Sequence, residues 1–232
     1  MRRFVSFGIV ALVLGLLATP PVAAQQAVNF YIGGFVPRAE DARSAQDVLV
    51  GNKAFLIFDV NELTGPTVGG EWLIGFGDKF EGSLGLGFYQ RSTPAADRFN
   101  EFKGTGDPII ADLKLRVVPF TATVRFLPLG NHYGVQPYIG AGVGVLAWRY
   151  SEAGDFVASD GVTIIHNSFV GNGTTTGPVI LGGLRVGAGS WGVGGEIRYQ
   201  AGEGDLPTDK GFAGSKIDLG GFNYLFTVNV RF

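Results

Sequence analysis

The chain contains no cysteine, only two histidines and few charged residues. Without cysteine it can form neither a disulfide framework nor a cysteine-based metal or catalytic site. Two histidines are too few for a His-rich metal site, and a net charge of −2 gives no indication of a nucleic-acid partner. Charged residues make up 16% of the chain, against a usual share of about 25%. The composition therefore predicts no nucleic-acid partner, no metal site and no cofactor.

Long apolar runs are absent after the first 24 residues, so no transmembrane helix is predicted there. The opening "MRRFVSFGIVALVLGLLATPPVAAQQ" places two arginines before an apolar run, then two helix-breaking prolines and a series of small residues. This order is typical of a secretory signal peptide with cleavage after Ala24. The run is also shorter than the roughly 20 residues that a membrane-spanning helix needs. We therefore expect a cleaved signal peptide over 1–24 and one domain over 25–232.

Apolar residues alternate with polar or small ones at a period of two through the rest of the chain, which predicts strands with two unlike faces. Most predicted strands reach about nine residues or more, whereas a strand of a soluble protein has about five or six. A tilted strand that crosses a membrane needs about 9 to 11 residues. Eight such segments occur, over 28–36, 68–76, 80–89, 118–126, 135–145, 180–188, 191–199 and 220–232.

The connections between these segments alternate between long and short. Short turns are expected at 77–79, 127–134 and 189–190, and long loops at 37–67, 92–111, 151–177 and 202–216. All long loops then fall at one end, as in outer-membrane barrels with short periplasmic turns and long external loops. The predicted fold is all-β, an eight-stranded antiparallel up-and-down transmembrane β-barrel located in the bacterial outer membrane.

Every second residue of the closing "GGFNYLFTVNVRF" is apolar or aromatic. An open strand edge in hydrocarbon would cost several kcal/mol per unpaired backbone group, so the last strand should pair with the first and face lipid. This C-terminal stripe consists of Phe222, Tyr224, Phe226, Val228, Val230 and Phe232. Beside the short turns we also expect a periplasmic aromatic girdle of Phe76, Phe80, Phe126 and Trp191.

Charges of both signs are expected on the inner face of the barrel. The interior of an eight-stranded barrel is just wide enough for side chains to fill it, which favours a salt-bridged polar plug over a narrow conduit. Glycines on the inner face leave some space in the lumen, so a narrow conduit remains the alternative. Within this lumen charge network, Arg185 and Glu196 are expected to lie diagonally across a hairpin. The predicted network consists of Glu71, Glu81, Arg116, Arg125, Arg185, Glu196, Arg198 and Arg231.

The signal peptide, the eight strands and the terminal "TVNVRF" resemble the small outer-membrane β-barrel superfamily, the barrel domains of the OmpA and OmpW types. "VPFTATVRFLP" followed by "VQPYIGAGVGV" is similar to their middle hairpin. The resemblance implies that the barrel assembly machinery reads the C-terminal stripe, and that outer-membrane lipid and lipopolysaccharide surround a monomeric barrel. OmpA-type proteins often carry a peptidoglycan-binding domain after the barrel, which is not expected here because the sequence stops at Phe232.

The resemblance implies a structural or surface-interaction role without catalysis, with a porin-like conduit for small molecules, including apolar ones, as the alternative. A second alternative is a lipid A-modifying barrel enzyme, since His166 and Ser168 match the spacing of the lipid A deacylase motif. Against it, Phe169 replaces the motif's asparagine, and the next glutamate, Glu196, lies on another predicted strand. Ser168 is also expected in a loop, where a triad would lack its orienting group.

Four further features of the sequence bear on its fold and function. A soluble lipocalin-like barrel would place the apolar face inside, but the one-ended long loops and the terminal stripe favour lipid. The glycines of "GAGVGV" alternate within a strand and lack the following helix of a nucleotide site. The apolar segment Lys53–Val60 is expected either to extend the barrel or to cap its mouth. The acidic loop residues Asp97, Glu101, Asp107 and Asp112 are expected to be solvated, without calcium-loop spacing.

Overall fold

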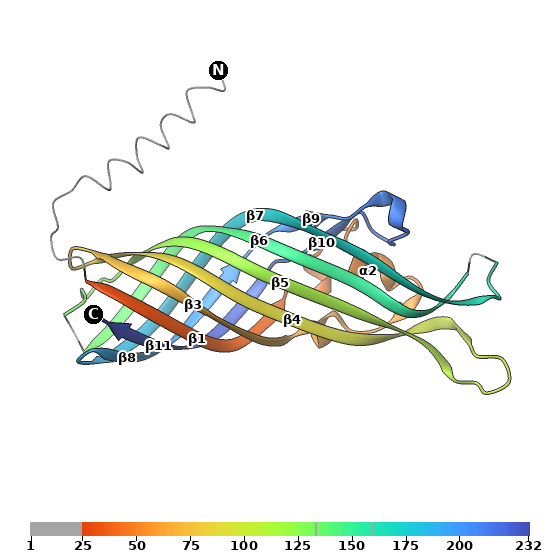
Figure 1. The fold of residues 1–232 in the computed structure, drawn as a ribbon, viewed down its shortest axis with the longest axis horizontal. Helices are drawn as coiled ribbons and strands as arrows, with labels where there is room; N and C mark the ends of the chain where they lie inside the picture. The colour runs from red at the N-terminus through yellow and green to blue at the C-terminus, as the bar shows by residue number, and fades with distance from the viewer. Residues whose placement is uncertain (1–24, 133, 159) are drawn as a thin grey trace, which may run out of the picture.

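The computed structural model describes residues 25–132, 134–158 and 160–232, so the predicted signal peptide lies outside the described residues. Eight antiparallel strands form a closed ring (Figure 1), in which each strand pairs with its neighbours and β1 pairs with β11 from Ala27↔Arg231 to Pro37↔Gly221. The predicted fold class, an eight-stranded antiparallel barrel, is confirmed. The ring consists of β1 (Gln26–Pro37), β3 (Gly65–Phe76), β4 (Phe80–Glu101), β5 (Pro108–Phe126), β6 (Val135–Val157), β7 (Ile164–Ala188), β8 (Trp191–Gln200) and β11 (Gly221–Arg231).

The short turns lie together at one end of the barrel, and the chain also ends there (Figure 1). The turns after β3 and β7 contain Gly77 and Gly189, with φ of 68° and 64°. Only glycine adopts this left-handed conformation without a steric cost, which is why these positions can reverse the chain so tightly. The predicted segregation of short and long connections to opposite ends is confirmed.

Two of the predicted long loops, 92–111 and 151–177, are mostly strand. β4, β5, β6 and β7 continue well past the other strands of the ring and form a curved sheet beyond it (Figure 1). In this extension the faces exchange character, because Leu113 and Leu115 are buried inside while Lys114 and Arg116 are exposed outside. These segments were predicted as loops because strands were expected only where the outer face is apolar. In the extension the apolar residues point inward instead, so the loop prediction was wrong.

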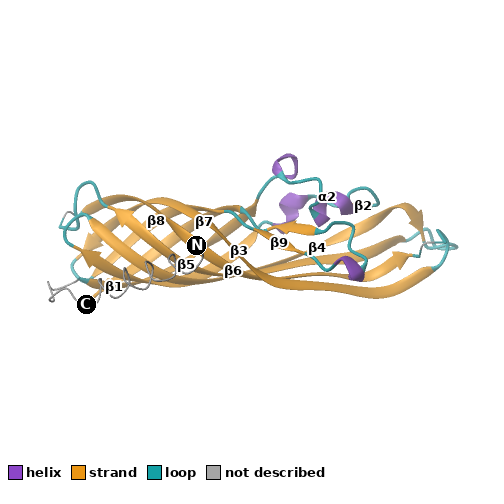
Figure 2. Ribbon diagram, turned by 90° about the horizontal axis from the view of Figure 1, so that it is seen from above, coloured by secondary structure: helices purple, strands orange, loops and turns teal. Residues whose placement is uncertain are grey.

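Two connections cover the inner face of this extension (Figure 2). We call residues 38–64 and 202–220 the cap. Their backbones meet where Lys216 N donates to Gln46 O over 3.1 Å. The cap contains η1 (Glu40–Ala42), α2 (Val48–Asn52), β2 (Leu56–Ile57), η2 (Val60–Leu63), β9 (Glu203–Asp205), η3 (Thr208–Lys210) and β10 (Lys216–Asp218). Among the described residues, none of the helices is long and apolar enough to cross a membrane.

The cap and the extended sheet share a hydrophobic core. Leu56, Phe58 and Val60, from the apolar segment Lys53–Val60, are buried in it. That segment therefore caps the barrel mouth, and its strand β2 also pairs with β4 through Leu56↔Asp97 and Ile57↔Ala96, so that both predicted placements hold in part. The remaining core residues come from both cap connections and from the inner face of the strands, and include Phe35, Val48, Leu49, Leu63, Tyr89, Leu113, Leu115, Leu146, Trp148, Tyr150, Leu206, Ile217 and Leu219.

The outer face of the ring itself is apolar. In β11, Phe222, Tyr224 and Phe226 are 45–54% exposed, while the intervening Asn223 and Leu225 are buried. Near the short turns Phe76 pairs with Phe80, and Phe80 with Phe126, whose rings lie 5.3 Å apart. The residues predicted as stripe and girdle thus lie on the outer surface, with Val228 and Val230 half-buried and Phe126, Trp191 and Phe232 exposed.

Candidate functional site: a charged lumen below a capped mouth

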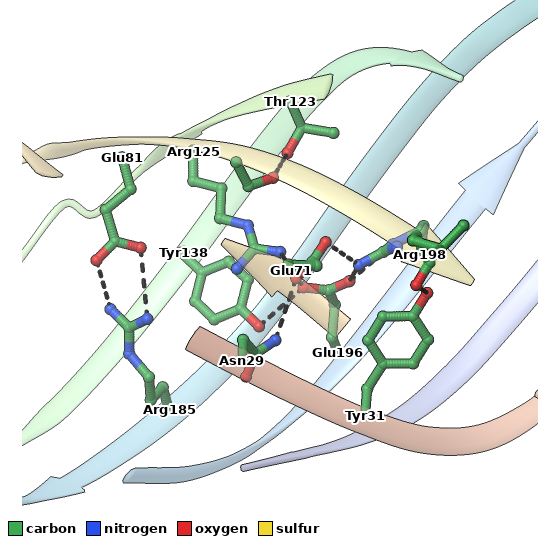
Figure 3. A network of polar contacts seen from close by, with 12 residues as sticks. Asn29, Tyr31, Glu71, Glu81, Thr123, Arg125, Tyr138, Arg185, Glu196 and Arg198 are labelled. Carbon is green, nitrogen blue, oxygen red and sulfur yellow. Dashed lines mark hydrogen bonds and ion pairs between the residues drawn. The ribbon is translucent and has the colours of Figure 1, made fainter. Parts of the chain in front are cut away.

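Four charged side chains form a closed ring at the centre of the lumen (Figure 3). Arg125 lies 2.6 Å from Glu71 and 3.0 Å from Glu196, and Arg198 lies 2.6 Å from Glu71 and 2.5 Å from Glu196. The strand alternation turns each residue inward from β3, β5 or β8, where all four are at most 3% exposed. Two positive and two negative charges cancel. We call these four residues the charge quartet.

Neutral side chains add hydrogen bonds and ring contacts to the charge quartet. Asn29 Nδ2 donates to Glu71 over 3.1 Å, and the Tyr138 hydroxyl donates to Glu196 over 3.0 Å. The guanidinium of Arg125 lies over the Tyr138 ring and that of Arg198 over the Tyr31 ring, about 5 Å from each centroid. A buried charge is stable only where it is paired and hydrogen-bonded. Each of the four charges has an ion-pair partner here, while Arg125 Nε is buried without a hydrogen bond among the described residues.

A second polar cluster lies nearer the short turns. Arg185 Nη2 is 2.7 Å from Glu81, and Arg185 Nε donates to Gln136 Oε1 over 2.9 Å. Arg231 donates to the same Gln136 oxygen over 2.5 Å. Glu81 and Arg231 are half-buried, whereas Arg185 is 3% exposed. This cluster fills the lumen between the charge quartet and the turn end of the barrel.

Seven of the eight predicted network residues thus point into the lumen, and the prediction for Arg116 is wrong. Arg116 is exposed on the outer face of β5, opposite Gln90 and Arg149. It shares its face with Phe120, four residues along the strand, as the period of two requires. The expected diagonal pair of Arg185 with Glu196 is also wrong. Arg185 bonds Glu81, because long side chains in this narrow lumen reach across it.

Beyond the charge quartet the lumen becomes apolar and closes against the cap. Phe35 and Tyr89 pack edge to face with ring centroids 4.7 Å apart, and the Tyr89 hydroxyl donates to the carbonyl of Leu63 in the cap. Leu146 is buried in the same core. The mouth is therefore filled by side chains of the barrel wall and of the cap.

Buried polar groups fix the cap in place. Asp47 accepts bonds from Leu49 N (2.8 Å) and Asp218 N (2.6 Å), which ties the start of α2 to β10 on the other cap connection. Arg43 pairs with the same carboxylate at 3.0 Å. Elsewhere Glu152 accepts from Asn52 and Tyr150 over 2.6 and 2.8 Å, without a cation, and burial raises the pKa of its carboxyl group.

The geometry gives no support to the lipid A-modifying enzyme. His166 and Ser168 lie on strand β7, not in a loop as predicted. His166 Nδ1 is 2.9 Å from Asp155 on the exposed surface, and within the described residues no hydrogen bond joins Ser168 to His166.

The described residues also contain no group of three or more His, Cys, Asp or Glu side chains placed to hold a metal ion. Of the acidic residues expected to be solvated, Asp97 accepts from the amides of Phe99 and Asn100.

The sequence allows the strand over 118–126 to extend back through Arg116 and Lys114, but sequence reasoning did not place Lys114 or Arg149 on the outer face beside Arg116. A signal for them exists. The outward alternation of Val143, Val145 and Ala147 continues to Arg149, just as that of Phe120 and Val118 continues to Arg116 and Lys114. Following the period of two past the apolar residues would have placed all three on the outer face.

No family model matches the chain, and no curated protein matches it either. Several solved structures are similar to it. They include the N-terminal β-barrel domain of Pseudomonas aeruginosa OprF (14% identity, TM-score 0.44, 90% of this chain and 99% of that chain covered) and the Neisserial surface protein A (12%, 0.47, 90% and 97%). Ail, the attachment invasion locus protein of Yersinia pestis, is similar at 13% identity with a TM-score of 0.40, covering 90% and 99%. Within the described residues, the eight antiparallel strand pairs close into an up-and-down β-barrel.

Proposed function

We propose that this chain is an integral outer-membrane β-barrel protein with a closed lumen, which acts through its external surface and not by catalysis. One observation carries the proposal: the ring is apolar outside and charged inside. Phe30, Leu84 and Ile180 are 57–58% exposed, whereas Glu71 and Arg125 are at most 3% exposed. A soluble barrel would have the reverse arrangement, with the apolar face inside.

The height of the apolar surface supports a membrane position. On β5 the outward residues run from Phe126 in the aromatic girdle to Arg116, the first outward charge, ten positions away. At about 3.4 Å per residue and a strand tilt of about 40°, this distance corresponds to about 25 Å along the barrel axis, the usual height of the apolar band of outer-membrane barrels. The extension and the cap then lie outside the membrane, on the external side.

Two partners and a monomeric state follow from this placement. Outer-membrane lipid, including lipopolysaccharide, would contact the apolar outer face. The barrel assembly machinery would read the C-terminal stripe that ends at Phe232. A monomer is proposed because the ring closes within one chain, so that no strand edge of the barrel remains for a second copy.

Fractionation and conductance together test the proposal. The mature chain should sediment with outer membranes and migrate differently on gels before and after heating, and refolded protein in planar bilayers should give no steady conductance. A matched variant with all four residues of the charge quartet replaced by alanine should conduct or leak, which shows that the assay can detect an opened lumen. Recovery as a soluble periplasmic protein would refute the membrane placement. Steady conductance of the unmodified protein would refute the closed lumen in favour of the conduit.

A mass shift of lipid A in cells that produce the protein would overturn the non-catalytic role. If such a shift occurs, His166→Ala should abolish it under the enzyme hypothesis, because His166 is the candidate base. Under our proposal lipid A keeps the same mass with the unmodified protein and with the variant.

A further inference from the structure

Three cationic side chains lie together on the outer face of the extended sheet. Arg116 on β5 and Arg149 on β6 are register partners, and Lys114 follows on β5 opposite Ser151. All three cations are exposed. Together with Gln90 and Ser151 they line a pocket of about 240 Å³ on the surface. We call Lys114, Arg116 and Arg149 the outer basic patch.

The charges of the outer basic patch are not neutralised by the protein. Within the described residues, none of the three cations takes part in a salt bridge or a hydrogen bond. Like charges directly opposite one another on neighbouring strands destabilise a sheet. The outward carboxylate next along β5, Asp112, lies beyond Lys114 and forms no ion pair with it. The patch is therefore a concentration of positive charge that a bound anion would stabilise.

The position of the patch indicates what kind of anion it meets. Immediately below it the outer face becomes apolar, through Val118 and Ala147 to Phe120 and its register partner Val145. Phe88 on β4 is also exposed at 45%. A ligand that spans both surfaces needs a negative head and an apolar body. The proposed membrane placement puts the patch at the external edge of the apolar band, where lipid headgroups lie.

We propose that the outer basic patch binds the phosphate group of an anionic lipid in the external leaflet, with the acyl chains lying along Phe88, Phe120 and Val145. Arginine suits this role because its planar guanidinium donates two parallel hydrogen bonds to phosphate oxygens. Lys114 adds a compact positive charge from the side away from the membrane. This inference rests on the proposed function, because it assumes that the apolar band lies in lipid.

Lipid binding in nanodiscs tests the inference. The refolded full chain is first inserted into phosphatidylcholine nanodiscs, and its binding of phosphatidic acid is then compared with that of phosphatidylcholine by native mass spectrometry. Each cation close to an anionic surface raises affinity by a factor of about five, so replacing Lys114, Arg116 and Arg149 by glutamine should weaken phosphatidic acid binding on the order of a hundredfold. The matched control replaces three exposed lysines elsewhere, Lys79, Lys103 and Lys210, by glutamine and should keep the preference.

Two further arms keep the outcome decisive. Asp112→Asn removes the one carboxylate next to the patch, so it should strengthen phosphatidic acid binding, a gain that misfolding cannot produce. Glycerol 3-phosphate has the same phosphate without acyl chains, and it should bind at least about tenfold more weakly than phosphatidic acid because it buries no apolar surface.

Three results would overturn the inference. Equal phosphatidic acid binding by the patch variant and the unmodified protein would show that the cations do not hold the lipid. Glycerol 3-phosphate binding as tight as that of phosphatidic acid would assign the patch to a soluble phosphate. Weaker binding by Asp112→Asn would contradict the electrostatic basis. Failure of the unmodified chain to insert into nanodiscs would instead refute the proposed function, so the two failures are distinguishable.

Discussion

Replacing Glu196 by glutamine tests whether the charge quartet acts as one unit. Glu196 forms an ion pair with Arg125 at 3.0 Å and accepts a hydrogen bond from Arg198 Nε over 2.9 Å. The glutamine keeps the shape of the side chain but removes its charge, so both arginines must share Glu71. Removing one member of a buried ion pair costs about 3 to 5 kcal/mol. Because each arginine keeps its contact with Glu71, at 2.6 Å in both cases, we expect the low end, about 3 kcal/mol.

A second substitution removes the surplus charge. Arg198→Met in the Glu196→Gln background leaves the neutral pair of Glu71 and Arg125, and the double variant should be more stable than the sum of the single effects by about 2 kcal/mol. Arg185→Met is the matched control. Arg185 bonds Glu81 and Gln136 and shares no partner with Glu196, so this second double variant should be additive within about 0.5 kcal/mol.

Urea unfolding in lipid vesicles measures these free energies. Tryptophan fluorescence provides the signal, since Trp72 and Trp191 are 45% and 59% exposed on the outer face and leave the lipid on unfolding. Strict additivity of Glu196→Gln with Arg198→Met would refute the coupled quartet and indicate a lumen wet enough to screen its charges. Equal coupling in both double variants would show that the two polar clusters are not independent.

Three further predictions concern the band, the cap and the lumen. Ala122→Arg, on the outer face of β5 near the middle of the apolar band between Phe126 and Arg116, should cost about 2 to 4 kcal/mol, while Ile110→Arg, equally outward on the same strand but above the band, should cost less than about 0.5 kcal/mol; similar costs in urea titrations would contradict the membrane placement. The raised pKa of Glu152 means that its native carboxyl keeps its proton where the unfolded one has lost it, so cap stability should be greatest at low pH and fall as the pH rises through that pKa. Hydrogen exchange of residues 38–64 should follow this trend and become less dependent on pH in Glu152→Gln; cap protection that increases with pH in the unmodified protein would have the wrong sign. Gly69→Ala would place a Cβ 2.3 Å from the Tyr31 hydroxyl oxygen and 2.4 Å from the carbonyl oxygen of Leu86, and should destabilise the barrel by about 1 to 3 kcal/mol, whereas an unchanged unfolding midpoint would indicate spare room in the lumen.

The barrel could be predicted because a single rule holds along each of its strands. Lipid selects an apolar residue at every outward position and leaves the inward positions polar or small, so the period of two is visible without any knowledge of the strand partners. The tight turns carry a second local signal, since Gly77 and Gly189 adopt positive φ. These two signals together fix the number of strands and the end at which the long connections lie.

The extension could not be predicted by the same rule, because the solvent on each face changes at the edge of the band. Below that edge the outer face is apolar and the lumen is charged. Above it the outer face is polar and the apolar inner face packs on the cap. Leu113 and Leu115 are apolar and inward, although apolar residues of the same strand further down, such as Val124, are outward. A rule that assumes the same surroundings along the whole strand therefore assigns the extension to polar loops. The cap could not be predicted either, because its core joins residues from opposite ends of the sequence, such as Leu49 and Ile217.

Arg116 shows which rule should decide at that edge. The assumption that charges point inward placed it in the lumen, while the alternation through Phe126, Val124 and Phe120 requires it to point outward. The alternation of side chains follows from the extended backbone and cannot change within a regular strand, whereas polarity depends on the surroundings, which do change. The outward placement of Arg116 marks the position at which the strand leaves the apolar band. The same side chain, with Lys114 and Arg149, therefore marks the end of the apolar band, where we propose that the membrane ends, and supplies the charge that we propose meets the lipid phosphate there.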